Sequence, residues 1–104
     1  MSASFLKPEG VREALQAELT DAALAVISRY KVEGPAAERR RDLWNALGRV
    51  VRRRREGAGA RGWREEMVAE AADAAYRVAL DQGFRGSFLD LELDIWKNLC
   101  RALA

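Results

Sequence analysis

The sequence predicts an all-α fold, a single-domain bundle of four helices. Three short stretches rich in glycine or proline divide the chain: EGP at 33–35, GAGARG at 57–62 and GFRGS at 83–87. The segments between them repeat apolar residues at spacings of three and four, which is typical of one face of a helix. None shows the sustained alternation of a strand. The expected helices cover about 8–33, 35–56, 63–82 and 88–102.

Length and composition agree with one globular domain over residues 1–104. The chain has 104 residues, of which 49% are hydrophobic and 33% charged, enough for one core and too few for two domains. No apolar run follows the Met-Ser-Ala start, and no uncharged stretch approaches the roughly 20 residues of a membrane span. The single cysteine, Cys100, cannot form an internal disulfide. We therefore expect a cytoplasmic protein without a signal peptide or membrane span.

The first segment is expected to begin near Pro8, because a helix does not need the missing N–H in its opening turn. Gly34 is expected to end it in a left-handed conformation, with Pro35 opening the second helix. Its apolar stripe consists of Val11, Leu15, Leu19, Ala22, Val26 and Tyr30.

The second segment is strongly basic, with eight arginines and three acidic residues between positions 38 and 56, a local balance of +5 in a chain of net charge +2. Trp44 is expected at the edge of the apolar stripe, and Arg54 on the apolar side at the last turn. The stripe itself consists of Leu43, Leu47, Val50 and Val51, and the arginines roughly opposite it are Arg41, Arg49, Arg52 and Arg53.

These arginines allow two interpretations. A guanidinium can hold phosphate oxygens in pairs, so the helix and the GAGARG loop could contact nucleic acid. The alternative is a solvated or protein-docking face, favoured because the aromatic residues are expected on inner helix faces and no segment resembles a helix-turn-helix. The possible nucleic-acid contacts are Arg41, Arg49, Arg52, Arg53 and Arg55.

The third segment carries Glu65 and Glu66 in its first turn, where negative charge is favoured, and is expected to end at Gly83. Ser87 is a good N-cap for the fourth segment, and Asp90 three residues later resembles a capping box. The inner face of the third segment consists of Trp63, Met67, Ala71, Ala74, Ala75 and Val78.

The apolar residues of the fourth segment spread over more than half of the helix circumference, about twice the width that a surface helix needs. The remaining narrow arc holds Asp90, Asp94, Lys97, Asn98 and Arg101. We therefore expect a homodimer or another protein partner docked through this helix. The alternative is a compact monomer in which the helix is central. The expected interface residues are Phe84, Phe88, Leu91, Ile95, Trp96 and Leu99.

Three further features have alternative interpretations. Glu92 lies within the wide apolar arc, either as a perturbed acid in a pocket or, as we favour, as a paired carboxylate at an interface. The GFRGSF turn is either a recognition corner or, as we favour, a tight turn whose Phe84 and Phe88 plug the end of the core. Cys100 is expected to be a small core residue rather than a reactive thiol.

The residue types argue against an enzyme. The chain has no histidine and one cysteine, so it lacks the commonest proton-transfer group, the usual zinc ligands and any Ser-His or Cys-His pair. No glycine-rich phosphate loop is present. We expect no catalytic, cofactor or metal site. The first hypothesis is a small non-enzymatic interaction module, an adaptor, regulator or assembly subunit that binds itself or another protein.

Overall fold

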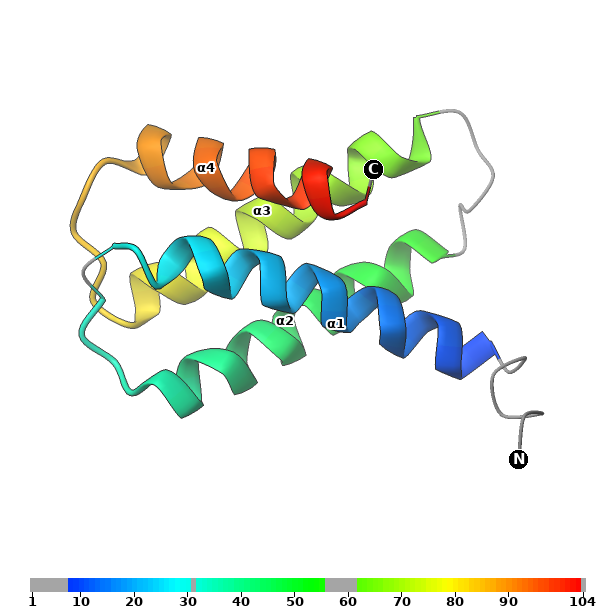
Figure 1. The fold of residues 1–104 in the computed structure, drawn as a ribbon, viewed down its shortest axis with the longest axis horizontal. Helices are drawn as coiled ribbons and strands as arrows, with labels where there is room; N and C mark the ends of the chain where they lie inside the picture. The colour runs from blue at the N-terminus through cyan, green and yellow to red at the C-terminus, as the bar shows by residue number, and fades with distance from the viewer. Residues whose placement is uncertain (1–7, 31, 56–61, 104) are drawn as a thin grey trace.

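The structure, a computed structural model, describes residues 8–30, 32–55 and 62–103. These residues form four helices and no strand, which confirms the all-α prediction. Consecutive helices run in opposite directions along the bundle (Figure 1). The helices are α1 (Pro8–Ile27), α2 (Ala36–Arg55), α3 (Trp63–Asp81) and α4 (Phe88–Ala102).

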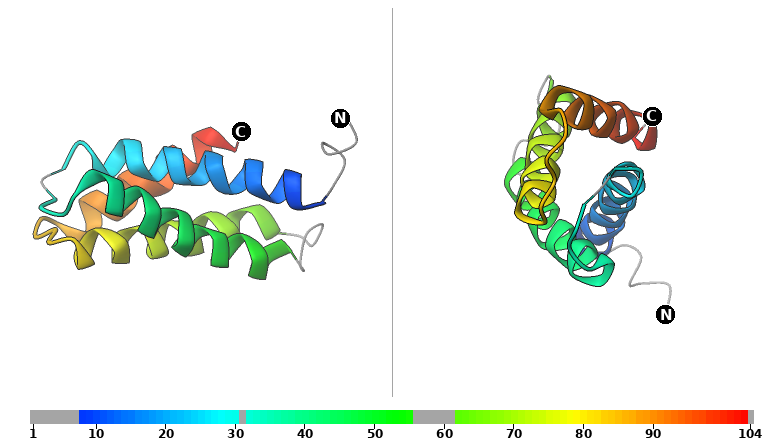
Figure 2. Two further views of the ribbon diagram at one scale, coloured as in Figure 1. Left: turned by 90° about the horizontal axis from the view of Figure 1, so that it is seen from below. Right: turned by 90° about the vertical axis from the view of Figure 1, so that its left-hand side faces the viewer.

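The bundle is two helices thick. Viewed along its length in Figure 2, α1 lies beside α2 and α4, and α3 also lies beside α2 and α4. The molecule measures 43 × 32 × 20 Å, and a helix with its side chains is about 10–12 Å across. Every helix therefore has an outer side. The alternative in which α4 is central and enclosed by the other three helices does not hold.

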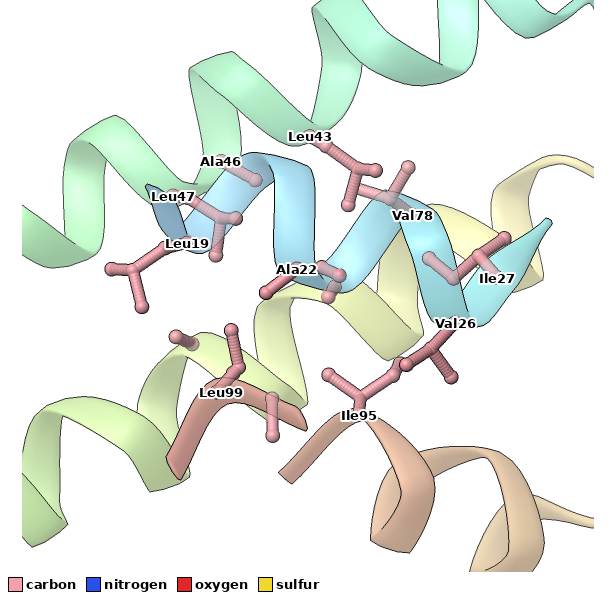
Figure 3. Packing of buried hydrophobic residues seen from close by; sticks show 14 of the residues in the cluster. Leu19, Ala22, Val26, Ile27, Leu43, Ala46, Leu47, Val78, Ile95 and Leu99 are labelled. Carbon is pink, nitrogen blue, oxygen red and sulfur yellow. The ribbon is translucent and has the colours of Figure 1, made fainter. Parts of the chain in front are cut away.

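The core is one cluster to which all four helices contribute. Figure 3 shows Val26 of α1 and Ile95 of α4 reaching toward each other across it. The expected stripe of α2 is buried in full, and Ala71 and Ala75 of α3 are completely buried, because small side chains let helices approach closely. The side chains of Val11 and Trp63, both expected inside, lie outside those that the structure describes.

The turn between α3 and α4 follows the expected capping chemistry. Gly83 has a φ of 91°, and its N–H donates to the Leu80 carbonyl while the Phe84 N–H donates to the Ala79 carbonyl. These two bonds are those of a Schellman motif, which only a residue tolerant of positive φ closes easily. Ser87 caps α4 by accepting the Asp90 N–H at 3.3 Å, so α4 begins at the predicted residue.

The prediction for the end of the first helix was wrong. The helix ends at Ile27 instead of near residue 33, and Gly34 is not left-handed. The N–H groups of Glu33 and Gly34 donate instead to the Gln82 carbonyl at the end of α3. A Cβ on Gly34 would lie 2.3 Å from Oε1 of Gln82, so the glycine serves this close approach. A tertiary contact thus replaces the last helical turn.

Candidate protein-association surface

Three buried residues hold α4 to its own chain. Leu91, Ile95 and Leu99 are completely buried, at spacings of four residues. Two polar residues beside them bind the first part of the chain: Asn98 donates to the Ala22 carbonyl of α1 at 2.8 Å, and Asp94 accepts the hydroxyl of Tyr30, which lies in the connection after α1. Part of the polar arc is therefore turned toward α1 and the connection that follows it. The helix is rotated so that part of its apolar arc faces outward.

The outward part of that arc is a row of four residues, Leu89, Leu93, Trp96 and Cys100, which we call the outer seam. The exposed fractions are 71% for Leu89, 49% for Leu93 and 42% for Trp96, and Cys100 is also exposed. The expectation that Cys100 is a core residue was therefore wrong. Its place one turn beyond Trp96 puts it on the outer side of the helix.

The six residues expected at an interface are divided by the structure. Phe84, Leu91, Ile95 and Leu99 lie in the core and are not available to a partner in this structure. Phe88 and Trp96 are exposed, at 44% and 42%. The expectation treated the apolar arc of α4 as one surface, whereas its two sides have different surroundings.

Phe88 connects the outer side of α4 to α3. Its ring meets Tyr76 edge-to-face, with centroids 4.6 Å apart. Tyr76 in turn meets the buried Phe84, whose other neighbour is Tyr30 at 5.8 Å. Phe84 thus closes the end of the core, as expected. The same expectation for Phe88 was wrong, because its side chain is exposed and packs only on the Tyr76 ring of α3 among the described aromatic residues.

Tyr30 holds α4 through its hydroxyl. The hydroxyl donates to the Asp94 carboxylate and also lies 3.3 Å from the Asp90 carbonyl. The hydrogen bond to Asp94, together with burial and the negative charges of both carboxylates, raises the pKa of Tyr30 to about 12. The proton therefore stays on the tyrosine until the pH approaches about 12.

Glu92 lies on the side of α4 nearest α3. Burial, and then the negative charge of Asp73, raises the pKa of its carboxyl above the ordinary value. No described residue forms an ion pair or hydrogen bond with it, so the described part of the chain does not supply the partner that a paired carboxylate needs. The carboxylate is partly desolvated and uncompensated within the described part of the chain.

Much of the basic charge of α2 is bound within the chain. Arg53 pairs with Glu70 at 3.2 Å, and Arg54 pairs with Glu66 at 2.9 Å and with Glu70. The hydrogen bonds that Arg54 donates to Glu70 raise the pKa of its guanidinium. Arg54 is on the α3 side, as its helical position predicts. Glu66 and Glu70 therefore bind the end of α2, and Glu66 also stabilises the first turn of α3.

Two other arginines are bound nearer the start of α2. Arg39 is buried and donates to the Val32 and Gly34 carbonyls at 3.1 and 2.5 Å. Arg40 pairs with Asp21 of α1 at 2.9 Å. Both attach α2 to its neighbours, which leaves fewer arginines for an external anion than the composition suggests.

The arginines expected to contact nucleic acid also differ in their surroundings. Arg41, Arg49, Arg52 and Arg53 are all exposed, as predicted, and the side chain of Arg55 lies outside those described. Arg49 and Arg52 have no ion-pair partner among the described residues. They line a groove of about 350 Å³ between α1 and α2, together with Glu13, Gln16, Trp44 and Asn45.

Trp44 is partly exposed, as its expected place at the edge of the apolar stripe predicts, so it does not lie on an inner face as the other aromatic residues were expected to do. Its side chain is 37% exposed and lines the same groove as Arg49 and Arg52, so an aromatic ring does lie beside arginines. Below it, Gln16 donates to the Trp44 carbonyl at 2.7 Å. Gly48 makes room for this bond, because a Cβ there would lie 2.5 Å from Nε2 of Gln16.

Sequence reasoning missed Leu89, Leu93 and Cys100 as surface residues. The signal was present in their spacing with Trp96, which alternates four, three and four residues. This is the spacing of a seam between two helices. The core residues Leu91, Ile95 and Leu99 follow a separate spacing, so the wide arc is two stripes rather than one.

The described residues hold neither a membrane-spanning helix nor a cluster of metal ligands. No described helix has both the length and the apolarity to cross a bilayer. Among the same residues, no three carboxylate, thiol or imidazole side chains gather closely enough to hold a metal ion. No protein-family model, curated protein or solved structure matches the chain.

Proposed function

We propose that the chain is a small non-enzymatic association module, in which the outer seam of α4 docks against another helix. The observation that supports this most directly is the side-by-side exposure of Leu89, Leu93 and Trp96 on a helix whose opposite side is already fully buried. Apolar patches of this kind usually mark interaction sites. Tryptophan in the middle of such a patch is a typical energetic anchor.

The partner that we propose is a second copy of the chain. Homodimers are the commonest assemblies of small soluble proteins, and a two-fold interface needs only one surface patch. The seam consists of four residues, whereas about 20–30 residues of each partner take part in a standard interface, so we expect a dissociation constant in the micromolar range. Exposed apolar residues continue onto α3: Phe88 packs on Tyr76 of that helix, and Leu80 of the same helix is also exposed.

The test is the mass of the protein in solution over a range of concentrations, measured by sedimentation and light scattering. The wild-type chain is expected to pass from monomer to dimer as its concentration rises. Trp96→Ala should move this transition to higher concentration by tenfold or more, because about 2 kcal/mol is typical for an anchor residue. The matched control is Trp44→Ala, which removes an equally exposed indole from α2 and should leave the transition unchanged.

Two results would contradict the proposal. One is the mass of a single chain at every concentration. The other is a dimer that responds equally to Trp44→Ala and Trp96→Ala, since the interface would then lie elsewhere. Circular dichroism of each variant establishes that the helices remain folded.

A second candidate function, contact with single-stranded nucleic acid, is favoured by the groove between α1 and α2. Arg49 and Arg52 are unpaired among the described residues, and Trp44 offers a ring on which a base could stack. With two phosphate contacts, the logarithm of the affinity should fall with the logarithm of salt concentration with a slope of about −1.4.

Fluorescence anisotropy of a labelled single strand and a labelled duplex tests this candidate. Replacing Arg49 and Arg52 together by Gln should abolish the salt-sensitive binding. The control replaces Arg40 and Arg53, which are bound to carboxylates, and removes the same charge from the same helix. Equal losses in the two double variants would show a response to net charge and contradict a site in the groove.

A further inference from the structure

We infer that the outer seams of two copies pair with their α4 helices antiparallel, with Leu89 of each copy against Cys100 of the other. This inference rests on the proposed function and adds the orientation and register of the interface. It comes from three features of α4: the spacing of its exposed apolar residues, the distribution of charge beside them, and the order already imposed on the helix by its own core.

The spacing supplies the geometry. Leu89 and Trp96 are seven residues apart, and so are Leu93 and Cys100, which is the repeat of a seam between two helices. Side chains at this repeat stay on one line when two helices wind around each other, and each inserts between residues of the facing helix. The buried stripe of Leu91, Ile95 and Leu99 is repeated at four residues and is engaged in the core. The seam is therefore free to meet a second helix without disturbing the fold.

The charge beside the seam supplies the orientation. Asp90 lies in the first turn of α4, Arg101 in its last turn and Lys97 between them, and all three are exposed. None of the three has an ion-pair partner among the described residues. A parallel pair of helices would place the two Asp90 residues at one end of the interface and the two Arg101 residues at the other. An antiparallel pair sets Asp90 of each copy near Lys97 of the other, and it also opposes the two helix dipoles.

The register follows from pairing seam positions across a two-fold axis. If Leu93 packs against Trp96 of the second copy, the axis passes between residues 94 and 95, and Leu89 then meets Cys100 of the second copy. Lys97 of the second copy comes close to Asp90 in the same register. With a rise of about 1.5 Å per residue, the two Cys100 residues lie about 16 Å apart along the helices.

A second copy fits this surface because the complementarity is internal to one helix. The acidic beginning and basic end of α4 match each other only when the helix is turned end over end, which is the operation of a two-fold axis. Two heptads are too short for free peptides to pair stably, since each would have to become helical first. Here α4 is already fixed by its core contacts and its Ser87 cap, so that ordering cost is absent.

Thiol cross-linking tests the register. Leu89→Cys, with Cys100 kept, is expected to form covalent dimers on mild oxidation, with peptide mapping showing a link between positions 89 and 100. The wild-type chain should stay unlinked, because about 16 Å far exceeds the roughly 7 Å between Cα atoms that a disulfide allows. The control is Ala25→Cys, which adds an exposed thiol on α1 instead.

Charge exchange tests the orientation without any thiol. Asp90→Lys and Lys97→Asp are each expected to weaken the dimer about tenfold, and the double variant should return to within a factor of about two of the wild type. Such rescue is expected only if the two positions face each other across the interface.

The outcomes separate this inference from the proposed function. Covalent wild-type dimers linked through Cys100 would indicate parallel helices and overturn the inference while leaving association intact. A reversible dimer in which Leu89→Cys forms no link to Cys100 would overturn the register. A chain that stays monomeric at every concentration would overturn both proposals.

Discussion

Helices α2 and α4 use their apolar residues in opposite ways. Every residue of the expected apolar stripe of α2 is buried, and its outer side is charged. In α4 the buried stripe is accompanied by exposed Leu89, Leu93 and Trp96. Its polar residues Asp94 and Asn98 bind Tyr30, in the connection after α1, and the Ala22 carbonyl of α1. The outer face of a surface helix is normally polar, as it is in α2. Apolar residues on the outer face of α4 are therefore informative about function, because packing of the core does not require them.

The basic charge of α2 is less free than its composition suggests. Arg39, Arg40, Arg53 and Arg54 are bound to carbonyls or carboxylates of the chain, whereas the charges beside the seam of α4 have no such partners among the described residues. The arginines of α2 therefore help to hold the helices together. The few charged residues beside the seam of α4 are better placed to bind a partner.

The largest change in stability is expected when the buried stripe of α4 is altered rather than its outer seam. Leu99→Ala should lower the free energy of unfolding by roughly 2–5 kcal/mol, because it leaves a cavity in the core. Leu93→Ala on the same helix should lower it by less than about 0.5 kcal/mol at concentrations where the chain is monomeric. Urea denaturation measures both. Similar losses would mean that the two stripes are not distinct.

The next effect concerns the bond that fixes the rotation of α4. Tyr30→Phe should cost about 1 kcal/mol, because Asp94 loses a hydrogen-bond donor on the side facing α1. The pKa of Tyr30 is raised from 10.0 to about 12, so this contribution is present below pH 10 and is lost as pH rises through about 12. Thermal unfolding at pH 7 measures the cost.

The matched control for that change is Tyr76→Phe, which alters the only other tyrosine. Tyr76 takes part through its ring, which stays in the variant, so its melting temperature should match that of the wild type. If Tyr76→Phe destabilised the chain as much as Tyr30→Phe, the loss could not be assigned to the bond with Asp94.

A smaller effect separates bound from unbound arginines on α2. Arg54→Gln should lower the melting temperature slightly at low salt, and the decrease should fade at high salt, since its pairs with Glu66 and Glu70 lie at the surface. Arg52→Gln, two residues earlier and without a described partner, should show no such salt dependence. A salt-sensitive loss in Arg52→Gln would indicate a partner for Arg52 that the described residues do not provide.

The smallest effect is the pH dependence of Glu92. Burial and the charge of Asp73 raise the pKa of this carboxyl, so the folded chain binds the proton more tightly than the unfolded chain does. Stability is therefore lost as pH rises from the ordinary value of 4.5 through the raised pKa. Glu92→Gln should melt at a slightly higher temperature at pH 7, and the difference should vanish below about pH 4. A difference that is constant with pH would have another origin.

Much of the fold could be predicted because its signals are local. The three breaks at glycine and proline, the Ser87 cap and the 3.6-residue periodicity depend on nearby residues, and the helices begin within one residue of their expected positions. The expected end of the first helix failed at Gly34 because the competing partner, the Gln82 carbonyl, is far away in sequence. Cys100 was misplaced for a similar reason, since its exposure depends on how α4 is turned.

The periodicity and turn residues of the chain are enough to specify four helices, the last of which carries more apolar surface than one side needs. Which part of that surface is covered depends on contacts between the helices. The choice depends on where α1 and α3 leave space and on the bonds from Tyr30 to Asp94 and from Asn98 to Ala22, which rotate α4 about its axis. Periodicity gives the relative angles of side chains around a helix, whereas the direction of the buried side is set by contacts between residues distant in sequence.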